Sequence, residues 1–319
     1  MEHRRDASLK VRAFKASDAD SVDALVRALW GHDPPMFAIY RFMHREWPPG
    51  QWLRRTLVAA IGDEVVGVGT LFENSLSPGR LHVTITVAID HQRRGVGSAL
   101  SDALTESGDS RPWLAQVAPR RDAAGWAFLR ARGFRVAIST LTGTLDSRSD
   151  SVRVWMESLP TEVSGYAIVP ADSALSPEKV ALVHAATARR YHAWNPMVEI
   201  STERALAMFG GAKVIPNSEP CVYAGDELVG AAHLIVHPFK RNADEAYLVN
   251  FGVVDDRSGA DDLTAALLRR CLEFAAEHGL RVGFEVDDPY EPHRSLLKAA
   301  PATNVSDDFV VMVNDEVRD

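Results

Sequence analysis

Two glycines and two arginines stand close together in one short segment, Gln92-Arg93-Arg94-Gly95-Val96-Gly97-Ser98. Glycine lets the backbone approach a ligand closely, and the first N–H groups of a helix have no partner within that helix. Helix starts of this kind bind phosphate groups, and the charges of Arg93 and Arg94 favour an anion further. The segment therefore predicts a binding site for a phosphate or pyrophosphate.

The neighbouring residues indicate which elements position this site. Leu81, Val83, Ile85 and Val87 alternate with more polar residues, which predicts a strand with one buried face. Val96, Ala99, Leu100, Ala103 and Leu104 then follow at helical spacing. The predicted arrangement is a strand, a tight loop and a helix. The segment has neither the Gly-Lys-Ser/Thr of a nucleotide P-loop nor the third glycine of a dinucleotide-binding turn.

This segment resembles motif A of the GNAT (Gcn5-related N-acetyltransferase) family, Gln/Arg-x-x-Gly-x-Gly/Ala, which holds the pyrophosphate of acetyl-CoA. Phe128 to Phe134 resembles the family's motif B, whose helix ends in a Gly-Phe pair. Leu129 stands where that motif usually has a tyrosine. The resemblance implies that the strand at Val87 splays from its neighbour and that the thioester lies beside Thr86 and Val87. The predicted cofactor-binding residues are Val87, Ala88, Gln92, Arg93, Arg94, Gly95, Val96, Gly97 and Ser98.

In the GNAT reaction an amine attacks the thioester carbonyl directly, so the amine must first lose a proton. His82 and Glu73 are the candidate catalytic bases, since both are expected near the acceptor end of the central strands. Histidine has the ordinary pKa better suited to this step. Leu129 cannot donate a proton to the departing thiolate. Either water or another group protonates coenzyme A, or the thiolate leaves without an acid. Asp122 occupies a position where the family often has an asparagine, and no role is assigned to it.

The second half of the chain repeats the first. Gly225-Asp226-Glu227-Leu228-Val229-Gly230 matches Gly62-Asp63-Glu64-Val65-Val66-Gly67, and a polar stretch separates the copies. The prediction is an α/β (α+β) protein of two tandem GNAT domains, each a mixed, mostly antiparallel sheet flanked by helices. The predicted boundaries are a catalytic domain at 1–148, a linker at 149–164 and a degenerate domain at 165–319.

The second copy lacks the Gly-x-Gly turn, and Asp261 and Asp262 stand near the predicted helix start. Carboxylates at this position interact well with the helix dipole but repel another anion. We therefore expect the second domain to have lost acyl-CoA and to serve as a scaffold or as one wall of the acceptor cleft. Aromatic residues between positions 30 and 50, including Phe37, Tyr40 and Trp47, are expected to line the acceptor side or to complete the core.

The composition is ordinary for a globular protein, with 46% hydrophobic and 24% charged residues among 319. The net charge of −8 argues against nucleic acid as a partner, because a phosphate-binding face needs a positive field. No apolar run approaches membrane-spanning length, so we expect a cytoplasmic protein without a membrane partner. Cys221 and Cys271 are expected to be buried free thiols.

No metal site is expected, because no carboxylate stands at helical ligand spacing from His184, and His192, His233 and His237 have no clear ligand pattern. The leading hypothesis is an acetyl-CoA-dependent N-acetyltransferase acting on a small-molecule amine, as a monomer or homodimer. Two alternatives stay open. One is a non-catalytic acyl-CoA-binding regulatory or scaffold protein, and the other is a transferase of another acyl group.

Overall fold

A computed structural model describes residues 8–30, 54–106, 109–120, 122–170, 176–209, 214–236, 244–288 and 291–315. It divides the chain into two compact units. Unit 1 comprises Met1–Ala137 together with Val310–Asp319, and unit 2 comprises Ile138–Phe309. None of the described helices is both long enough and apolar enough to cross a lipid bilayer.

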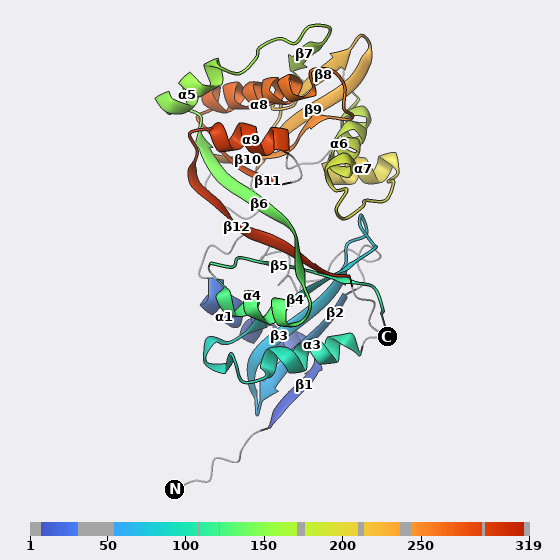
Figure 1. Ribbon diagram of the computed structural model, residues 1–319, viewed down its shortest axis with the longest axis vertical. Helices are drawn as coiled ribbons and strands as arrows, with labels where there is room; N and C mark the ends of the chain where they lie inside the picture. Colours follow the sequence, from blue (N-terminus) through green and yellow to red (C-terminus); the bar gives the residue numbers. More distant parts are fainter. Residues whose placement is uncertain are drawn as a thin grey trace. The chain divides into compact units, whose positions relative to one another are not determined.

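Unit 1 is built on a sheet in the order β1-β2-β3-β4-β5-β12 (Figure 1). The strands are β1 (Leu9–Ala13), β2 (Arg54–Ile61), β3 (Glu64–Glu73), β4 (Leu81–Val87), β5 (Trp113–Val117) and the last residues of β12 (Thr303–Asn314). Its helices are α1 (Ala19–Trp30), α3 (Val96–Thr105) and α4 (Ala123–Ala131). Neighbouring strands are antiparallel except β4 and β5, so the predicted mixed, mostly antiparallel sheet is confirmed.

Helices cover both faces of this sheet because the strands alternate apolar side chains between the two faces. Leu57 of β2 belongs to the core cluster that contains Leu100 of α3. Its neighbour Val58 belongs to a second cluster with Val22 and Leu25 of α1. The periodicity of β2 therefore anchors α3 on one face and α1 on the other.

The strands β4 and β5 pair over only two residues. Leu81 lies beside Trp113 and His82 beside Leu114, and no further pairs follow along the described strands. Beyond these pairs the strands diverge, which leaves backbone of β4 from Val83 onward without a neighbour on that side. The structure thus has the splayed strands that the GNAT resemblance implies.

The domain boundaries differ from those predicted. The division falls inside β6 (Arg135–Asp146), and the predicted linker at 149–164 contains α5 (Asp150–Glu157). The apolar residues Val152 and Met156 are one helical turn apart, and both are buried in the core of unit 2. The segment is therefore part of that unit, even though its composition is polar.

The C-terminal end of the chain completes unit 1. Residues Val310–Asn314 of β12 pair antiparallel with Val117–Trp113 of β5. Met312 is fully buried in the core of unit 1, and the side chain of Asn314 donates to the carbonyl of Arg132. Asp315 forms ion pairs with Arg80 and Arg135.

Unit 2 has the strand order β12-β6-β11-β10-β9-β8-β7. Its remaining elements are β7 (Ala167–Pro170), α6 (Pro177–Tyr191), α7 (Thr202–Phe209), β8 (Pro220–Ala224), β9 (Glu227–Val236), β10 (Glu245–Val253), α8 (Ala260–Glu277), β11 (Arg281–Asp287) and α9 (Glu291–Ala299). The parallel strands β10 and β11 pair over only three residues, as β4 and β5 do over two. Cys221 and Cys271 are free and buried, as predicted.

Candidate active site

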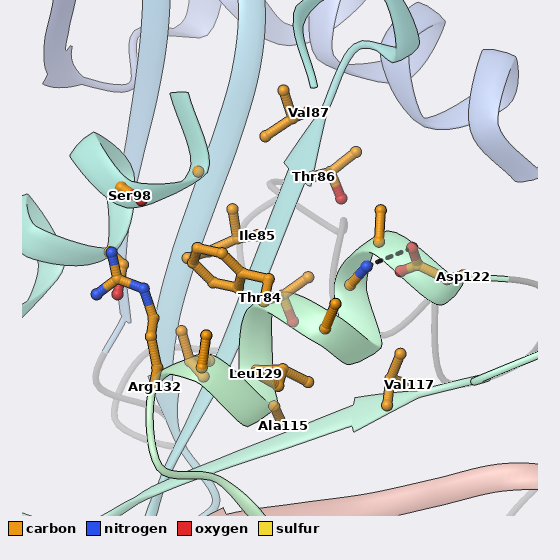
Figure 2. Close-up of a pocket in the computed structure, with 18 of the residues that line it drawn as sticks. Thr84, Ile85, Thr86, Val87, Ser98, Ala115, Val117, Asp122, Leu129 and Arg132 are labelled. Atoms are coloured by element: carbon orange, nitrogen blue, oxygen red, sulfur yellow. Dashed lines mark hydrogen bonds between the residues drawn. The ribbon is translucent and has the colours of Figure 1, made fainter. Parts of the chain in front are cut away.

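A cavity of about 560 Å³ lies in unit 1 where β4 and β5 diverge (Figure 2). It extends from the beginning of α3 along β4 to one face of α4. Its lining is mostly uncharged, and the charged side chains among the described lining residues are Arg93, Asp122 and Arg132. A cavity that combines backbone from a free strand edge with a helix start suits an elongated ligand that has an anionic end.

The beginning of α3 has the geometry of an anion site. Gly95 caps the helix with a left-handed backbone (φ 83°), and Arg93 also has a positive φ of 61°. These two conformations turn the chain sharply, and Gly97 and Ser98 in the first turn of α3 line the cavity. The first N–H groups of a helix have no partner within that helix, so they are available to a ligand there. The side chain of Gln92 donates to the carbonyl of Val87 over 3.2 Å, which ties the loop to the end of β4.

Gly97 keeps the cavity open beside this loop. A Cβ atom built there would lie 3.5 Å from Phe128 and 3.8 Å from Val87, and both of these residues line the cavity. Its backbone is not in the left-handed region and these distances are ordinary van der Waals contacts, so the protein itself has room for a Cβ, which would instead take space from a ligand in the cavity. The cavity therefore provides the close approach to backbone that a pyrophosphate needs.

Six of the nine predicted cofactor-binding residues line the cavity: Val87, Gln92, Arg93, Gly95, Gly97 and Ser98. The other three do not. The N–H of Ala88 donates to the carbonyl of Val66, and the side chain of Val96 is buried in the core. Arg94 is exposed and lies outside the set of lining residues.

The prediction missed two groups of lining residues. Thr84 of β4 is 9% exposed, and among the described residues its hydroxyl has no hydrogen-bond partner. Gly125, Phe128, Leu129 and Arg132 form one face of α4. Their spacing of three and four residues marks a helix face in the sequence, but the sequence does not say that this face meets β4. The Arg132 guanidinium lies 4.8 Å from the centre of the Phe128 ring.

Asp122 and Leu129 have structural roles in α4. Asp122 caps the helix, and its carboxylate accepts from the N–H of Gly125 over 2.7 Å (Figure 2). Leu129 is 9% exposed and packs into the core of unit 1. The position of the usual GNAT tyrosine therefore holds an apolar side chain that also lines the cavity.

The two candidate bases lie near each other on adjacent strands but outside the set of cavity-lining residues. His82 pairs with Phe72 in the sheet, and their rings stack with centres 4.8 Å apart. By strand alternation, the side chain of His82 is on the same face of β4 as those of Thr84 and Thr86. Glu73 instead forms an ion pair with Arg111, in which Glu73 Oε2 lies 2.6 Å from Arg111 Nη1.

Arg111 also holds Asp109 at 2.6 Å and donates to the carbonyl of Pro78. Hydrogen bonds from Arg111 lower the pKa of Asp109, and the same contacts raise the pKa of Arg111. The Glu73 carboxylate is thus paired with a permanent cation.

In unit 2, the start of α8 corresponds to the start of α3, but side chains of unit 2 itself form bonds there. Gly259 caps α8 with a φ of 78°, as Gly95 caps α3, but Asp261 stands in the place of Gly97. Arg190 donates to the carbonyls of Val253 and Asp255 and pairs with Asp256. These contacts place a guanidinium and carboxylates at the helix start.

The edge of β10 is also occupied within unit 2. His293 Nε2 donates to the carbonyl of Phe251 over 2.7 Å, and the His293 ring packs against Tyr191. Burial lowers the pKa of His293 to about 4 and raises the pKa of Tyr191 to about 12, so both side chains are neutral at pH 7. The missing Gly-x-Gly is therefore accompanied by side chains that bond to the strand edge.

Pro34, Pro35, Phe37, Tyr40, Phe42 and Trp47, which the sequence placed on the acceptor side or in the core, lie outside the described residues, as does His237.

Comparison with known proteins supports the same fold. Residues 22–134 match the model of the acetyltransferase (GNAT) family. A search of curated proteins found no match. A GCN5-related N-acetyltransferase from Sphaerobacter thermophilus is 14% identical, with a TM-score of 0.62 and coverage of 98% of this chain and 96% of that one.

A tandem GNAT protein from the clavulanic acid biosynthesis pathway is 18% identical, with a TM-score of 0.64, and the match covers 97% of this chain and 98% of that chain. A glucosamine N-acetyltransferase region of a fungal multi-domain β-N-acetylglucosaminidase is 14% identical, with a TM-score of 0.63 over 98% of this chain and 38% of that one. Residues 22–134 therefore belong to the GNAT acetyltransferase family, and the chain as a whole has the tandem GNAT fold.

Proposed function

We propose that unit 1 is an acetyl-CoA-dependent N-acetyltransferase that acts on the amine of a small molecule. The observation that supports this most is the cavity that runs from the glycine-capped start of α3 into the divergence of β4 and β5. Gly95, Gly97, Ser98 and Arg93 would hold the pyrophosphate, and the free edge of β4 would bond to the pantetheine arm. Unit 2 would act as a scaffold without acyl-CoA.

Positioning is the main contribution of these residues. Holding an amine in line with a thioester can supply on the order of 7 to 11 kcal/mol of the barrier, which exceeds what a single acid or base provides. Thr84 and Thr86 line the part of the cavity beyond Val87, where the acyl group would lie. The Thr84 hydroxyl is available there to donate to an acyl oxygen.

We assign the base role to His82 in preference to Glu73, because Glu73 is paired with Arg111. His82 would take the amine proton directly or through one water molecule. Leu129 offers no proton to the departing thiolate, so water protonates coenzyme A or the thiolate leaves unassisted.

The test of this base assignment is a pair of isosteric variants. His82→Gln should lower kcat at least tenfold without changing KM for acetyl-CoA and should remove the acidic limb of the pH–rate profile, because the base acts only when it is deprotonated. Glu73→Gln should leave kcat within about twofold. The reverse ranking would transfer the base role to Glu73.

The test of the function is incubation with acetyl-CoA and a panel of small amines, read by release of free thiol. We expect turnover with at least one amine, and calorimetry should find one coenzyme A per chain. Arg93→Glu, which replaces a cation beside the cavity by an anion, should weaken coenzyme A binding at least tenfold and lower thiol release at the same acetyl-CoA concentration.

Leu129 also supports a second candidate, a regulatory or scaffold protein that binds acyl-CoA without turning it over. Tight binding of acetyl-CoA with no thiol release on any amine would favour this candidate. Release of thiol only from longer acyl-CoA would instead identify a transferase of another acyl group, which the apolar lining around Leu129 and Trp113 would accommodate.

A further inference from the structure

Three side chains with metal-ligating atoms meet inside unit 2, far from one another in the sequence. His184 comes from α6, Glu219 from the segment before β8 and His233 from β9. His184 is fully buried, His233 is 3% exposed and the Glu219 side chain is 24% exposed. Within the described parts of the chain, no other three His, Cys, Asp or Glu residues converge in this way.

The distances between the three ligand atoms fit a single metal ion. His233 Nδ1 lies 2.8 Å from His184 Nε2, and Glu219 Oε1 lies 3.6 Å from the former and 3.8 Å from the latter. A point equidistant from three atoms at these separations is about 2.0 Å from each, while Zn–N and Zn–O bonds are about 2.0–2.2 Å. The ligand atoms of a tetrahedral ion with bonds of this length are about 3.3 Å apart, so the two ring nitrogens would separate by about half an ångström on binding.

Without a cation, Glu219 Oε1 is too far from both ring nitrogens for a hydrogen bond of ordinary length. One ring nitrogen must donate its N–H to the other, because they are 2.8 Å apart. Glu219 Oε1 stands 3.6 Å or more from both nitrogens, which is beyond the usual 2.7–3.2 Å of a hydrogen bond. A divalent cation between them would bond to all three atoms at once.

The nearby thiols do not take part. Cys221 Sγ donates to the carbonyl of Glu219, and Cys271 Sγ donates to the carbonyl of Ser218. The ligand set is therefore two imidazoles and one carboxylate, which suits Zn²⁺ with a water molecule at the fourth position. The exposed part of Glu219 gives the ion and that water a route from solvent.

We propose that His184 Nε2, His233 Nδ1 and the carboxylate of Glu219 bind one Zn²⁺ ion in unit 2. The ion ties α6 to β9 and to the segment before β8, so it stabilises this unit. The proposal is independent of the function proposed for unit 1. It departs from the sequence-based expectation that no metal site exists, which considered only carboxylates at helical spacing from His184 and so did not include Glu219.

The experiment uses the full-length protein, freed of metal by chelation and then titrated with ZnCl₂ in a calorimeter. We expect one Zn²⁺ per chain and a rise in Tm on binding. Titration with Co²⁺ should produce the intense visible absorption of a four-coordinate ion. Glu219→Gln keeps the shape of the side chain but should weaken Zn²⁺ binding at least tenfold and remove the Co²⁺ band.

His278→Gln is the matched control, because it also removes one histidine but is exposed and lies outside the cluster. It should bind Zn²⁺ like the parent protein, and both variants should show the parent's circular dichroism. Equal Zn²⁺ affinity in the parent and Glu219→Gln would overturn the proposal. If Glu219→Gln does not fold, the titrations of the parent protein provide the test. Absence of stoichiometric Zn²⁺ binding and of the Co²⁺ band in the parent would overturn the proposal.

Discussion

Arg93 and Arg94 are adjacent in the sequence but have different surroundings. Both residues are exposed, but Arg93 is among the residues that line the cavity and Arg94 is not. A charge next to a bound anion acts on it over a short distance, whereas a more distant exposed charge is screened by water and salt. We therefore expect Arg93 to contribute more than Arg94 to the binding of an anion in the cavity.

We expect Arg93→Glu to weaken coenzyme A binding at least tenfold, since a charge-assisted hydrogen bond contributes about 1.5–3 kcal/mol. Arg94→Glu should weaken it by less than about threefold, because this side chain acts through solvent. Calorimetric titration of both variants at one ionic strength measures the difference. Equal losses would mean that the ligand does not enter the cavity beside Arg93.

Arg111 provides the clearest dependence of stability on pH. It lowers the pKa of Asp109, so the ion pair stabilises the fold at pH values above the ordinary carboxyl pKa, and this stabilisation is lost as the pH falls through the lowered value. Arg111→Met should cost about 1 kcal/mol at pH 7, and this difference should shrink below about pH 4. Urea unfolding of both proteins at pH 7 and pH 3 tests the sign; a difference that grows in acid would contradict it.

At the scale of elements, the start of α3 and the start of α8 share a glycine cap but differ in the residue two positions later. Both helices are capped by a left-handed glycine, Gly95 or Gly259. Only α3 continues with a second glycine at a position where a side chain would enter the cavity. The cap alone therefore preserves the fold, and the second glycine provides the space for a ligand.

Substituting these two glycines should separate stability from binding. Gly95→Ala places a side chain at a φ of 83° and should lower the free energy of unfolding by about 1–2 kcal/mol. Gly97→Ala should leave stability unchanged or raise it by up to about 1 kcal/mol, because alanine favours the helix, yet it should weaken coenzyme A binding. Urea unfolding and calorimetry measure the two effects. Unchanged binding in Gly97→Ala would argue against a ligand at this position.

At the scale of the molecule, unit 1 depends on residues 310–314 of β12, which follow unit 2 in the sequence. Met312 of β12 is fully buried in the core beside β5. Without these residues the edge of β5 is left unpaired, and β5 forms one side of the cavity. Unit 1 therefore needs residues that lie beyond unit 2 in the sequence.

Met312→Ala should lower the free energy of unfolding by about 2–5 kcal/mol, the usual range for a buried methionine. Val305→Ala is the control on the same strand, because Val305 is 54% exposed and should cost less than about 0.5 kcal/mol. Thermal unfolding followed by circular dichroism compares them. A small effect of Met312→Ala would mean that β12 does not support the core of unit 1.

The sequence by itself determined what short-range patterns encode. The alternation before Val87, the helical spacing after Val96 and the glycines between them predicted the strand, loop and helix of the anion site, because each depends on neighbouring residues only. The repeat of the Gly-Asp-Glu turn predicted the duplication for the same reason.

Only the tertiary structure decided which distant residues meet. It placed β12 beside β5, brought the Leu129 face of α4 to β4, paired Glu73 with Arg111 and joined His184 and His233 to Glu219. Each of these contacts depends on strand order and helix packing across long stretches of chain. No local spacing records such contacts, and this is why the domain boundary and the convergence of His184, Glu219 and His233 escaped the sequence.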